Sequence, residues 1–237
     1  MTTTYRVEVA IFAIALAIFG LVALALAWSG DWAYTALANL NGVTQTSFLI
    51  GGGVLDPRRV ETPLDLATVI SWHHAWAAYV TGASSIPAIS WGPDPIFTKD
   101  ETAHMADVRT VFRGAESAAA LALFVLVFRV VRARRRGDAL RLVRAGSLIA
   151  AGIVAIIGVA AAVAFDPLFL LFHDVFFPQG NFLFDPATSN LIRLYPEWYW
   201  QGITAGVGVS FIAIALLVAG VAHRALRRRS NTYTRAA

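Results

Sequence analysis

The sequence predicts an all-α membrane protein with four transmembrane helices and an extracytoplasmic cap of interfacial helices and loops. Of its 237 residues, 57% are hydrophobic and only 14% are charged, whereas an average soluble domain is about 25% charged. The apolar residues gather in long runs, and the Arg residues gather beside those runs. We therefore expect a single membrane domain over residues 1–237, and no nucleic-acid partner despite the net charge of +4.

The first span is predicted over about 7–28. Every residue from Val9 to Ala27 is apolar or Gly, and such a run is close to the ~20 residues that cross a ~30 Å hydrocarbon core. No small-residue cleavage site follows a short apolar region, so we interpret this segment as an uncleaved anchor.

Three further Ala-rich runs predict spans over about 114–131, 145–165 and 202–222. The flanking charges predict how these spans are oriented. The segment 129–144 carries seven Arg against one Asp, and five more Arg follow His223. Because an excess of Lys and Arg marks cytoplasmic loops, both basic segments are expected inside the cell.

This orientation assigns a side to each part outside the spans. The loop 132–144 and the tail 223–237 are expected in the cytoplasm, together with the N-terminus. The segments 29–113 and 166–201 are expected at the outer face, and they hold four of the five histidines. We therefore expect a multi-pass protein of the cytoplasmic membrane whose functional site lies at the outer face.

A further helix is predicted over 62–81, with Thr62 as its N-cap, Pro63 at its first position, Asp65 three residues after the cap and Gly82 after its end. A fifth span here would move the Arg-rich loop outside, so we interpret the segment as an interfacial or re-entrant helix. Three aromatic residues are expected at headgroup level: Trp72, Trp76 and Tyr79.

The first candidate site lies just before the second span, in 98–113. Thr98 and Glu101 form a capping box, which predicts a helix. At helical spacing Glu101, His104 and Asp107 share one face, so either carboxylate can hold an imidazole nitrogen and orient a working base. The same pattern equally fits a solvated juxtamembrane helix whose His and acidic residues only face water.

The second candidate site is the aromatic segment 166–200. His173 stands among several Phe residues, and Asp174, Asn181 and Asp185 bring further polar groups into the same apolar strip. The alternative interpretation is an interfacial aromatic belt without chemistry.

The remaining histidines are expected to be structural. His73 and His74 are adjacent in the predicted helix and point about 100° apart, and His223 stands among Arg residues at the end of the last span. The chain contains no Cys, which excludes a thiolate nucleophile and a disulfide. No metal-binding spacing and no GxSxG motif occurs, so we expect neither a metal nor a serine nucleophile.

Two outer strings match a known pattern. The first is Glu101-x-x-His104-Met105-x-Asp107-Val108-Arg109. The second begins at His173-Asp174-x-Phe176-Phe177 and continues through Phe184-Asp185-Pro186, Leu191-Ile192 and Pro196-Glu197 to Trp200. On these strings and the four-span layout, the chain resembles the lipoprotein intramolecular transacylases, a bacterial family of integral membrane proteins. Arg109 stands where the family pattern has Lys as often, a change that keeps the charge but not the geometry.

The resemblance implies transfer of the sn-2 acyl chain of a diacylated lipoprotein to the α-amine of its lipidated N-terminal cysteine, giving a lyso-form lipoprotein. His104 and His173 are the implied catalytic residues, one as base and one as acid. The implied supporting residues are Glu101, Asp107, Arg109, Asp174, Asn181 and Asp185. The expected partners are the lipoprotein N-terminus and membrane lipid, and we expect a monomer without a cofactor.

Three alternatives from other classes stay open on the sequence. A non-catalytic lipid- or lipoprotein-binding membrane protein would use the same residues for binding. A haem-binding electron carrier would need paired histidines inside two spans, whereas the candidate pair lies outside them. A lipid hydrolase or intermolecular acyltransferase would differ only in its product.

Overall fold

The computed structural model describes residues 3–51 and 59–236, with side chains described up to Arg229. Residues 52–58 of the predicted outer segment and residue 237 of the predicted tail lie outside the described residues. The chain folds into two compact units. We call residues 1–25, 115–163 and 205–237 the helical unit, and residues 26–114 and 164–204 the mixed unit. Because their segments alternate, neither unit is one continuous length of sequence.

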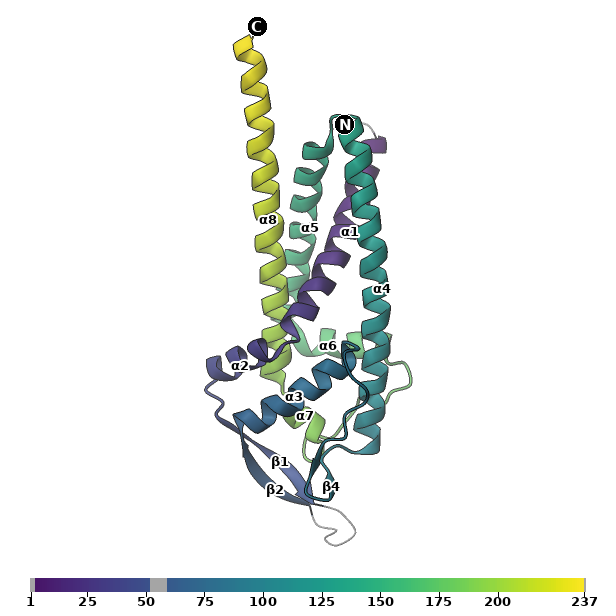
Figure 1. Ribbon diagram of the computed structural model, residues 1–237, viewed down its shortest axis with the longest axis vertical. Helices are drawn as coiled ribbons and strands as arrows, with labels where there is room; N and C mark the ends of the chain where they lie inside the picture. Colours follow the sequence, from purple (N-terminus) through teal and green to yellow (C-terminus); the bar gives the residue numbers. More distant parts are fainter. Residues whose placement is uncertain (1–2, 52–58, 237) are drawn as a thin grey trace. The chain divides into compact units, whose positions relative to one another are not determined.

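Four helices among the described residues are long and apolar enough to cross a membrane. These are α1 (Thr3–Trp28), α4 (Lys99–Arg135), α5 (Ala139–Val163) and α8 (Glu197–Ala236) (Figure 1). The four predicted transmembrane helices and the mostly helical fold class are therefore confirmed. The polar start of α4, up to Gly114, belongs to the mixed unit and precedes the predicted span.

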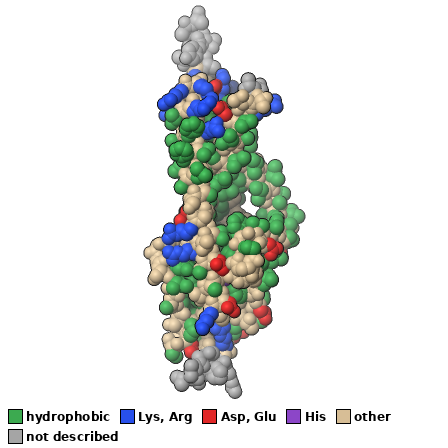
Figure 2. Space-filling model, turned by 90° about the vertical axis from the view of Figure 1, so that its right-hand side faces the viewer, with side chains coloured by type: hydrophobic (Ala, Val, Ile, Leu, Met, Phe, Trp, Pro, Cys, Tyr) green, Lys and Arg blue, Asp and Glu red, His purple; other side chains and the backbone are tan. Residues whose placement is uncertain are grey.

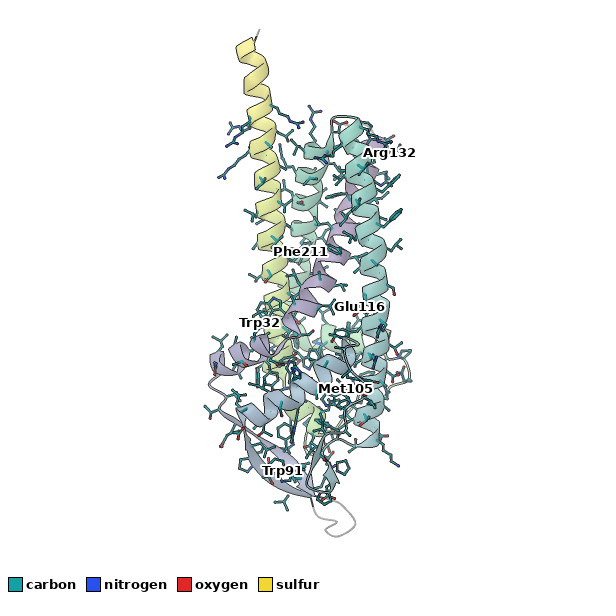
Figure 3. The ribbon with its side chains drawn as sticks, in the orientation of Figure 1. Trp32, Trp91, Met105, Glu116, Arg132 and Phe211 are labelled. Carbon is teal, nitrogen blue, oxygen red and sulfur yellow. The ribbon has the colours of Figure 1, made fainter. Side chains whose placement is uncertain are left out.

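Small residues let the helices of the helical unit approach one another closely. Gly146 of α5 lies against the Phe12 ring of α1, and a Cβ at Gly20 would lie 2.6 Å from the Phe211 ring. Phe211 is labelled on α8 in Figure 3, and it packs in a cluster with Ala13 and Ala150. Without a hydrophobic drive between helices in lipid, this close packing holds the bundle together.

The outward faces of the helical unit are apolar, and its Arg side chains gather at one end. Large hydrophobic side chains such as Ile156, Val159 and Leu217 are exposed, as expected for groups that meet lipid. Figure 2 shows hydrophobic side chains along this unit and Arg side chains, coloured blue, gathered at its upper end, where Figure 1 shows the α4–α5 turn. At that end Arg136 donates two hydrogen bonds, of 2.9 and 2.6 Å, to the buried Glu8 carboxylate.

The mixed unit contains short strands that the sequence analysis did not predict. β1 (Gln45–Gly51) pairs antiparallel with β2 (Arg59–Asp65), and β3 (Ser90–Trp91) pairs with β4 (Asp94–Pro95). The helices of this unit, besides the start of α4 and of α8, are α2 (Asp31–Leu40), α3 (Leu66–Val80), α6 (Phe165–Phe176) and α7 (Asn190–Leu194). Figure 1 shows α3 and α7 beside the β1–β2 sheet.

The predicted start of the helix over 62–81 is wrong. Thr62 and Pro63 lie in β2, and the helix begins at Leu66 with Asp65 as its N-cap, whose side chain accepts a 2.7 Å hydrogen bond from the Thr68 amide. Its predicted end is confirmed, because Thr81 is the C-cap and Gly82 follows with a φ of +82°.

The expected place of the α3 aromatic residues is also wrong. Trp72, Trp76 and Tyr79 are at most 7% exposed and form the core of the mixed unit with Met105 and Leu191. They therefore stabilise the protein interior and are not presented to lipid headgroups. Met105, labelled in Figure 3, brings the start of α4 into this core.

Buried Asn190 joins α7 to the strands. Its amide donates hydrogen bonds of 2.8 Å to the Leu49 carbonyl and 2.7 Å to the Ile96 carbonyl, and it accepts one of 2.8 Å from the Leu49 amide. Because the side chain is fully buried, each of these bonds satisfies a group that water cannot reach.

Candidate active site

The start of α4 is held by the predicted capping box, which is confirmed. The Thr98 hydroxyl accepts a 3.1 Å hydrogen bond from the Glu101 amide, and the Glu101 carboxylate accepts one of 2.7 Å from the Thr98 amide. The reciprocal pair satisfies two amides that the first turn of a helix leaves open.

Glu101 also holds the start of α7. Its second oxygen accepts hydrogen bonds of 2.6 Å from the Ser189 hydroxyl and 2.8 Å from the Leu191 amide, and the side chain is 1% exposed. The three hydrogen bonds described for this carboxylate therefore come from donors other than His104. The sequence analysis expected His104 as the partner of Glu101. It could not indicate Ser189, because that residue is distant along the chain.

Asp107 holds the loop between α6 and α7. Its Oδ2 accepts hydrogen bonds of 2.9 Å from Gln179 Nε2 and 2.5 Å from Asn181 Nδ2. We expected Asp107 to orient His104 directly, but the hydrogen bonds described for it go to this loop. The prediction of one shared helix face is nevertheless useful, since Glu101, His104 and Asp107 all turn toward the segment 177–191.

His104 is buried under that loop. Its ring centroid lies 4.8 Å from that of Phe177 and 5.6 Å from that of Phe184, and the residue is 7% exposed. Burial is the largest influence on the His104 pKa and lowers it, and the neighbouring His173 lowers it too. The Asn181 side chain and the Asp107 charge raise it but do not restore the ordinary value. At neutral pH the imidazole is therefore uncharged.

His173 stands on α6 inside an aromatic cage. Its ring centroid lies 4.3 Å from that of Phe169, 5.0 Å from that of Phe182 and 5.4 Å from that of Phe177. Its Nδ1 lies 2.8 Å from the Phe169 carbonyl oxygen. A carbonyl only accepts hydrogen bonds, so Nδ1 carries the proton and Nε2 of the neutral ring keeps a lone pair.

The structure brings the two predicted catalytic histidines together. The ring centroids of His104 and His173 are 6.2 Å apart and the ring planes differ by 17°. Both rings contact Phe177. Two imidazoles in one apolar enclosure can together accept and return protons at a single reacting group.

The other predicted site residues take different places. Arg109 donates a 3.1 Å hydrogen bond to the Ser84 carbonyl and lies 4.6 Å above the Tyr79 ring centre, so it fastens the end of α3 to α4. The Asp185 carboxylate accepts a 2.8 Å hydrogen bond from the Ala187 amide and shapes the turn before α7. Asp174 is exposed on α6 next to His173.

A hollow of about 320 Å³ opens beside the loop. Its lining includes Asp100, Ala103, Asn181 and Phe184, and Phe184 also contacts the His104 ring. The hollow therefore reaches the polar loop that covers His104. Sequence reasoning missed this use of Phe184, and it missed Gln179 and Ser189, because no local pattern shows which loop covers a helix.

The remaining histidines lie apart from this pair. His73 is 1% exposed, with its Nδ1 3.3 Å from the Tyr195 hydroxyl. His74 is exposed on α3 and forms a 2.9 Å pair with Asp31.

The comparisons with known proteins decide the family. The model of the family described as lipoprotein intramolecular transacylase Lit matches residues 8–200. The chain belongs to this family. Membership makes it an acyltransferase by class and confirms the resemblance seen in its two outer strings. The comparison with curated proteins finds no match.

Solved structures of the membrane integral Lit from Bacillus cereus share the fold. The chain aligns with one over 98% of its own length and 100% of the other, with a TM-score of 0.69 and 13% identity. It also aligns with a variant in which a histidine is replaced by arginine. This match covers 97% of its own length and 95% of the other chain, with a TM-score of 0.67 and 14% identity. A third, with alanine at a histidine position, covers 96% of each chain with a TM-score of 0.68 and 11% identity. This membrane protein therefore has the same fold as Lit.

Proposed function

We propose that this Lit family member moves one acyl chain within a diacylated bacterial lipoprotein, from the sn-2 ester of the glyceryl group to the α-amine of the lipidated N-terminal cysteine. The product is a lyso-form lipoprotein that has one new amide and one free glyceryl hydroxyl. Family membership supports the class of reaction. The substrate supplies both the nucleophile and the ester, so the enzyme needs neither a Ser nor a Cys nucleophile.

The observation that carries the proposal is the pairing of His104 with His173. Two helices from separate parts of the chain, α4 and α6, place these rings 6.2 Å apart in one aromatic enclosure. The reaction removes protons from nitrogen and delivers one to oxygen, which suits two imidazoles that can accept and donate protons side by side.

The two rings have different tasks in this proposal. The α-ammonium has an unperturbed pKa of about 7.7–8.0, and His173 takes its first proton at Nε2. The free amine attacks the ester carbonyl, and His104, which burial keeps neutral, takes the second proton from the tetrahedral intermediate. His173 returns its proton to the glyceryl oxygen as the ester bond breaks. The products are an amide, an alcohol and one proton, which leaves from His104.

Orientation is the larger contribution in this scheme. Amine and ester belong to one flexible molecule, and holding them in contact can contribute ~7–11 kcal/mol, whereas positioned acid and base groups are worth ~10²–10⁴-fold. The Phe rings around His173 offer an apolar surface to the acyl chain and exclude water that would hydrolyse the ester.

The remaining predicted residues support this arrangement. Glu101, Asp107 and Asn181 hold the loop over His104, while Arg109 and Asp185 shape the surrounding turns. The exposed Asp174 is placed to attract the cationic α-ammonium toward His173. We further propose that the protein acts as a monomer on lipoprotein and lipid in the cytoplasmic membrane, with its site at the outer face and both termini inside.

Mass spectrometry of a lipoprotein N-terminus tests the reaction. In cells that lack N-acyltransferase activity, the wild type should move one acyl chain from glycerol to the amine at unchanged total mass. His104→Ala and His173→Ala should each lower the rate by ~10²-fold or more, since each removes a proton-transfer group.

A matched control is His74→Ala, which removes an exposed histidine paired with Asp31 in the same unit. This variant should form the lyso product as the wild type does. Loss of the acyl chain without a new amide would replace the proposal by a hydrolase. An unchanged lipoprotein in cells that contain the folded protein would replace it by a non-catalytic binding role.

A further inference from the structure

Two buried polar atoms beside each other lack a hydrogen bond. Among the described residues, His104 Nδ1 and Asn181 Oδ1 have no partner within hydrogen-bond geometry, although both are shielded from solvent. Asn181 is hydrogen-bonded to Asp107, which lies about one turn along α4 from His104, so the two side chains lie close together, and the Asn181 side chain raises the His104 pKa. An amide oxygen only accepts, and an imidazole nitrogen can donate, so the two atoms are complementary.

Asp107 determines which way the Asn181 amide faces. Its carboxylate oxygen accepts the 2.5 Å hydrogen bond from Asn181 Nδ2. A carboxylate cannot donate, so the NH₂ group must face Asp107 and the amide oxygen must face away from it. The oxygen left over is the Oδ1 atom that has no partner among the described residues.

We infer that Asn181 is the positioning residue of His104: its side-chain oxygen accepts a hydrogen bond from the Nδ1–H of the ring in the working enzyme, and Asp107 orients the ring only through the Asn181 amide that it holds. The catalytic consequence rests on the proposed function, whereas the hydrogen bond itself does not. It assigns Asp107 an indirect role in place of the direct one that the sequence predicts.

We call the chain of contacts from Asp107 through Asn181 to His104 the relay. It gives both histidines the same tautomer. His173 Nδ1 donates to the Phe169 carbonyl, and His104 Nδ1 donates to Asn181 in the inferred arrangement. Each neutral ring then keeps its lone pair at Nε2, the nitrogen that can receive a proton from the substrate. The hydrogen bond that Nδ1–H donates to Asn181 also favours the imidazolium that forms when His104 accepts a proton.

Nitrogen-15 NMR of the histidine-labelled protein in detergent tests the hydrogen bond without any assay of activity. The His104 signal is assigned by its loss in His104→Gln. In the wild type it should show the tautomer protonated at Nδ1, and in Asn181→Ala its titration midpoint should move to lower pH. Asp107 and His173 are the other charged or titratable groups that influence this ring, and both remain in Asn181→Ala.

Kinetics with a diacylated lipopeptide test the relay. Asn181→Ala should lower kcat by at least ~10-fold with little change in KM, because the base loses its orientation. The acidic limb of its pH–rate profile should move to lower pH. Asp107→Ala should act in the same direction, and the double variant should be no slower than Asn181→Ala alone, since both changes break one chain of contacts.

The matched control is Gln179→Ala, which removes the other donor to Asp107 without touching His104. Its acidic limb should stay where the wild type has it. Additive losses in the double variant, or a His104 signal protonated at Nε2 in the wild type, would overturn the relay. If the wild type forms no lyso product while NMR shows Nδ1–H at His104, the relay stands and the proposed function fails.

Discussion

His73 shows how a single buried residue links stability to pH. It is 1% exposed, and burial lowers its pKa below the ordinary value of about 6.5, although Asp31 and nearby backbone groups partly oppose this. The unfolded chain then binds a proton at mildly acidic pH that the folded protein does not bind. The stability that neutral His73 contributes is present above pH ~6.5 and is lost as the pH falls below it.

We therefore expect the Tm of the detergent-solubilised protein to fall between pH 7 and pH 5. His73→Gln should reduce the slope of Tm against pH, and the exposed His74→Gln should keep it. His104, whose pKa is also lowered by burial, leaves a residual slope in the His73 variant. An unchanged slope in His73→Gln would contradict this account of its burial.

At the same scale, sequence reasoning picked out the two histidines that the fold brings together, but not the residues that hold them. His104 and His173 stood out because a histidine near carboxylates or among aromatic residues is unusual just outside a span. The carboxylates themselves were assigned to the wrong neighbour, because spacing along a helix shows which residues share a face and not what lies opposite. Asn181 and Gln179 became partners of Asp107 only through the fold.

The start of α4 is held by several hydrogen bonds to one buried side chain, Glu101. Glu101 receives three hydrogen bonds, two of them at one oxygen, from Thr98, Ser189 and Leu191. Glu101→Gln keeps the shape but turns one oxygen into a donor, so at least one buried donor loses its acceptor. This loss costs about 1–3 kcal/mol and should lower Tm by roughly 2–12 °C in a chain of this size.

Thermal unfolding in detergent measures this effect. The control is Asp100→Asn, an equally conservative change at the adjacent exposed position, which should leave Tm within about 1 °C of the wild type, as surface substitutions do. Equal Tm values for the two variants would show that Glu101 does not hold α7.

The β1–β2 pair explains why one predicted helix began too early. Thr62-Pro63 matches a helix start, but Pro63 lies opposite Ser47 in a two-stranded sheet. Every strand of such a sheet is an edge, where Pro is tolerated because its missing amide faces outward. The N-cap pattern simply recurs three residues later at Asp65, and local sequence alone does not choose between the two.

For the whole molecule, the distribution of Arg predicts the orientation in the membrane. Alkaline phosphatase is active only outside the cytoplasm, so its fusion after Ser85 should be active and its fusions after Gly137 and Ala237 should be inactive. Fluorescent-protein fusions at the same positions, which report the cytoplasm, serve as the control with the reverse pattern. Activity after Ala237 would place the C-terminus outside and contradict the assignment from the Arg residues.

The large-scale features were predictable because lipid imposes them. A span needs a long apolar run, and the four runs of this chain become α1, α4, α5 and α8. The mixed unit does not need long apolar runs. Its strands and its aromatic core depend on pairings between distant segments, such as Asn190 with Leu49 and Ile96, which no local pattern reports.

The hydrogen bonds of Glu101 and Asp107 on α4 have a consequence for the binding of a substrate. Glu101 holds the loop after α6 at Ser189 and Leu191, and Asp107 holds it at Asn181, with His104 between them. Fixing the backbone of a flexible residue costs about 1–2 kcal/mol, and here the protein meets that cost when it folds. The enclosure is preorganised, so little of the binding energy of a lipoprotein is used to order it. That energy can instead hold the amine of the lipoprotein in contact with its own ester.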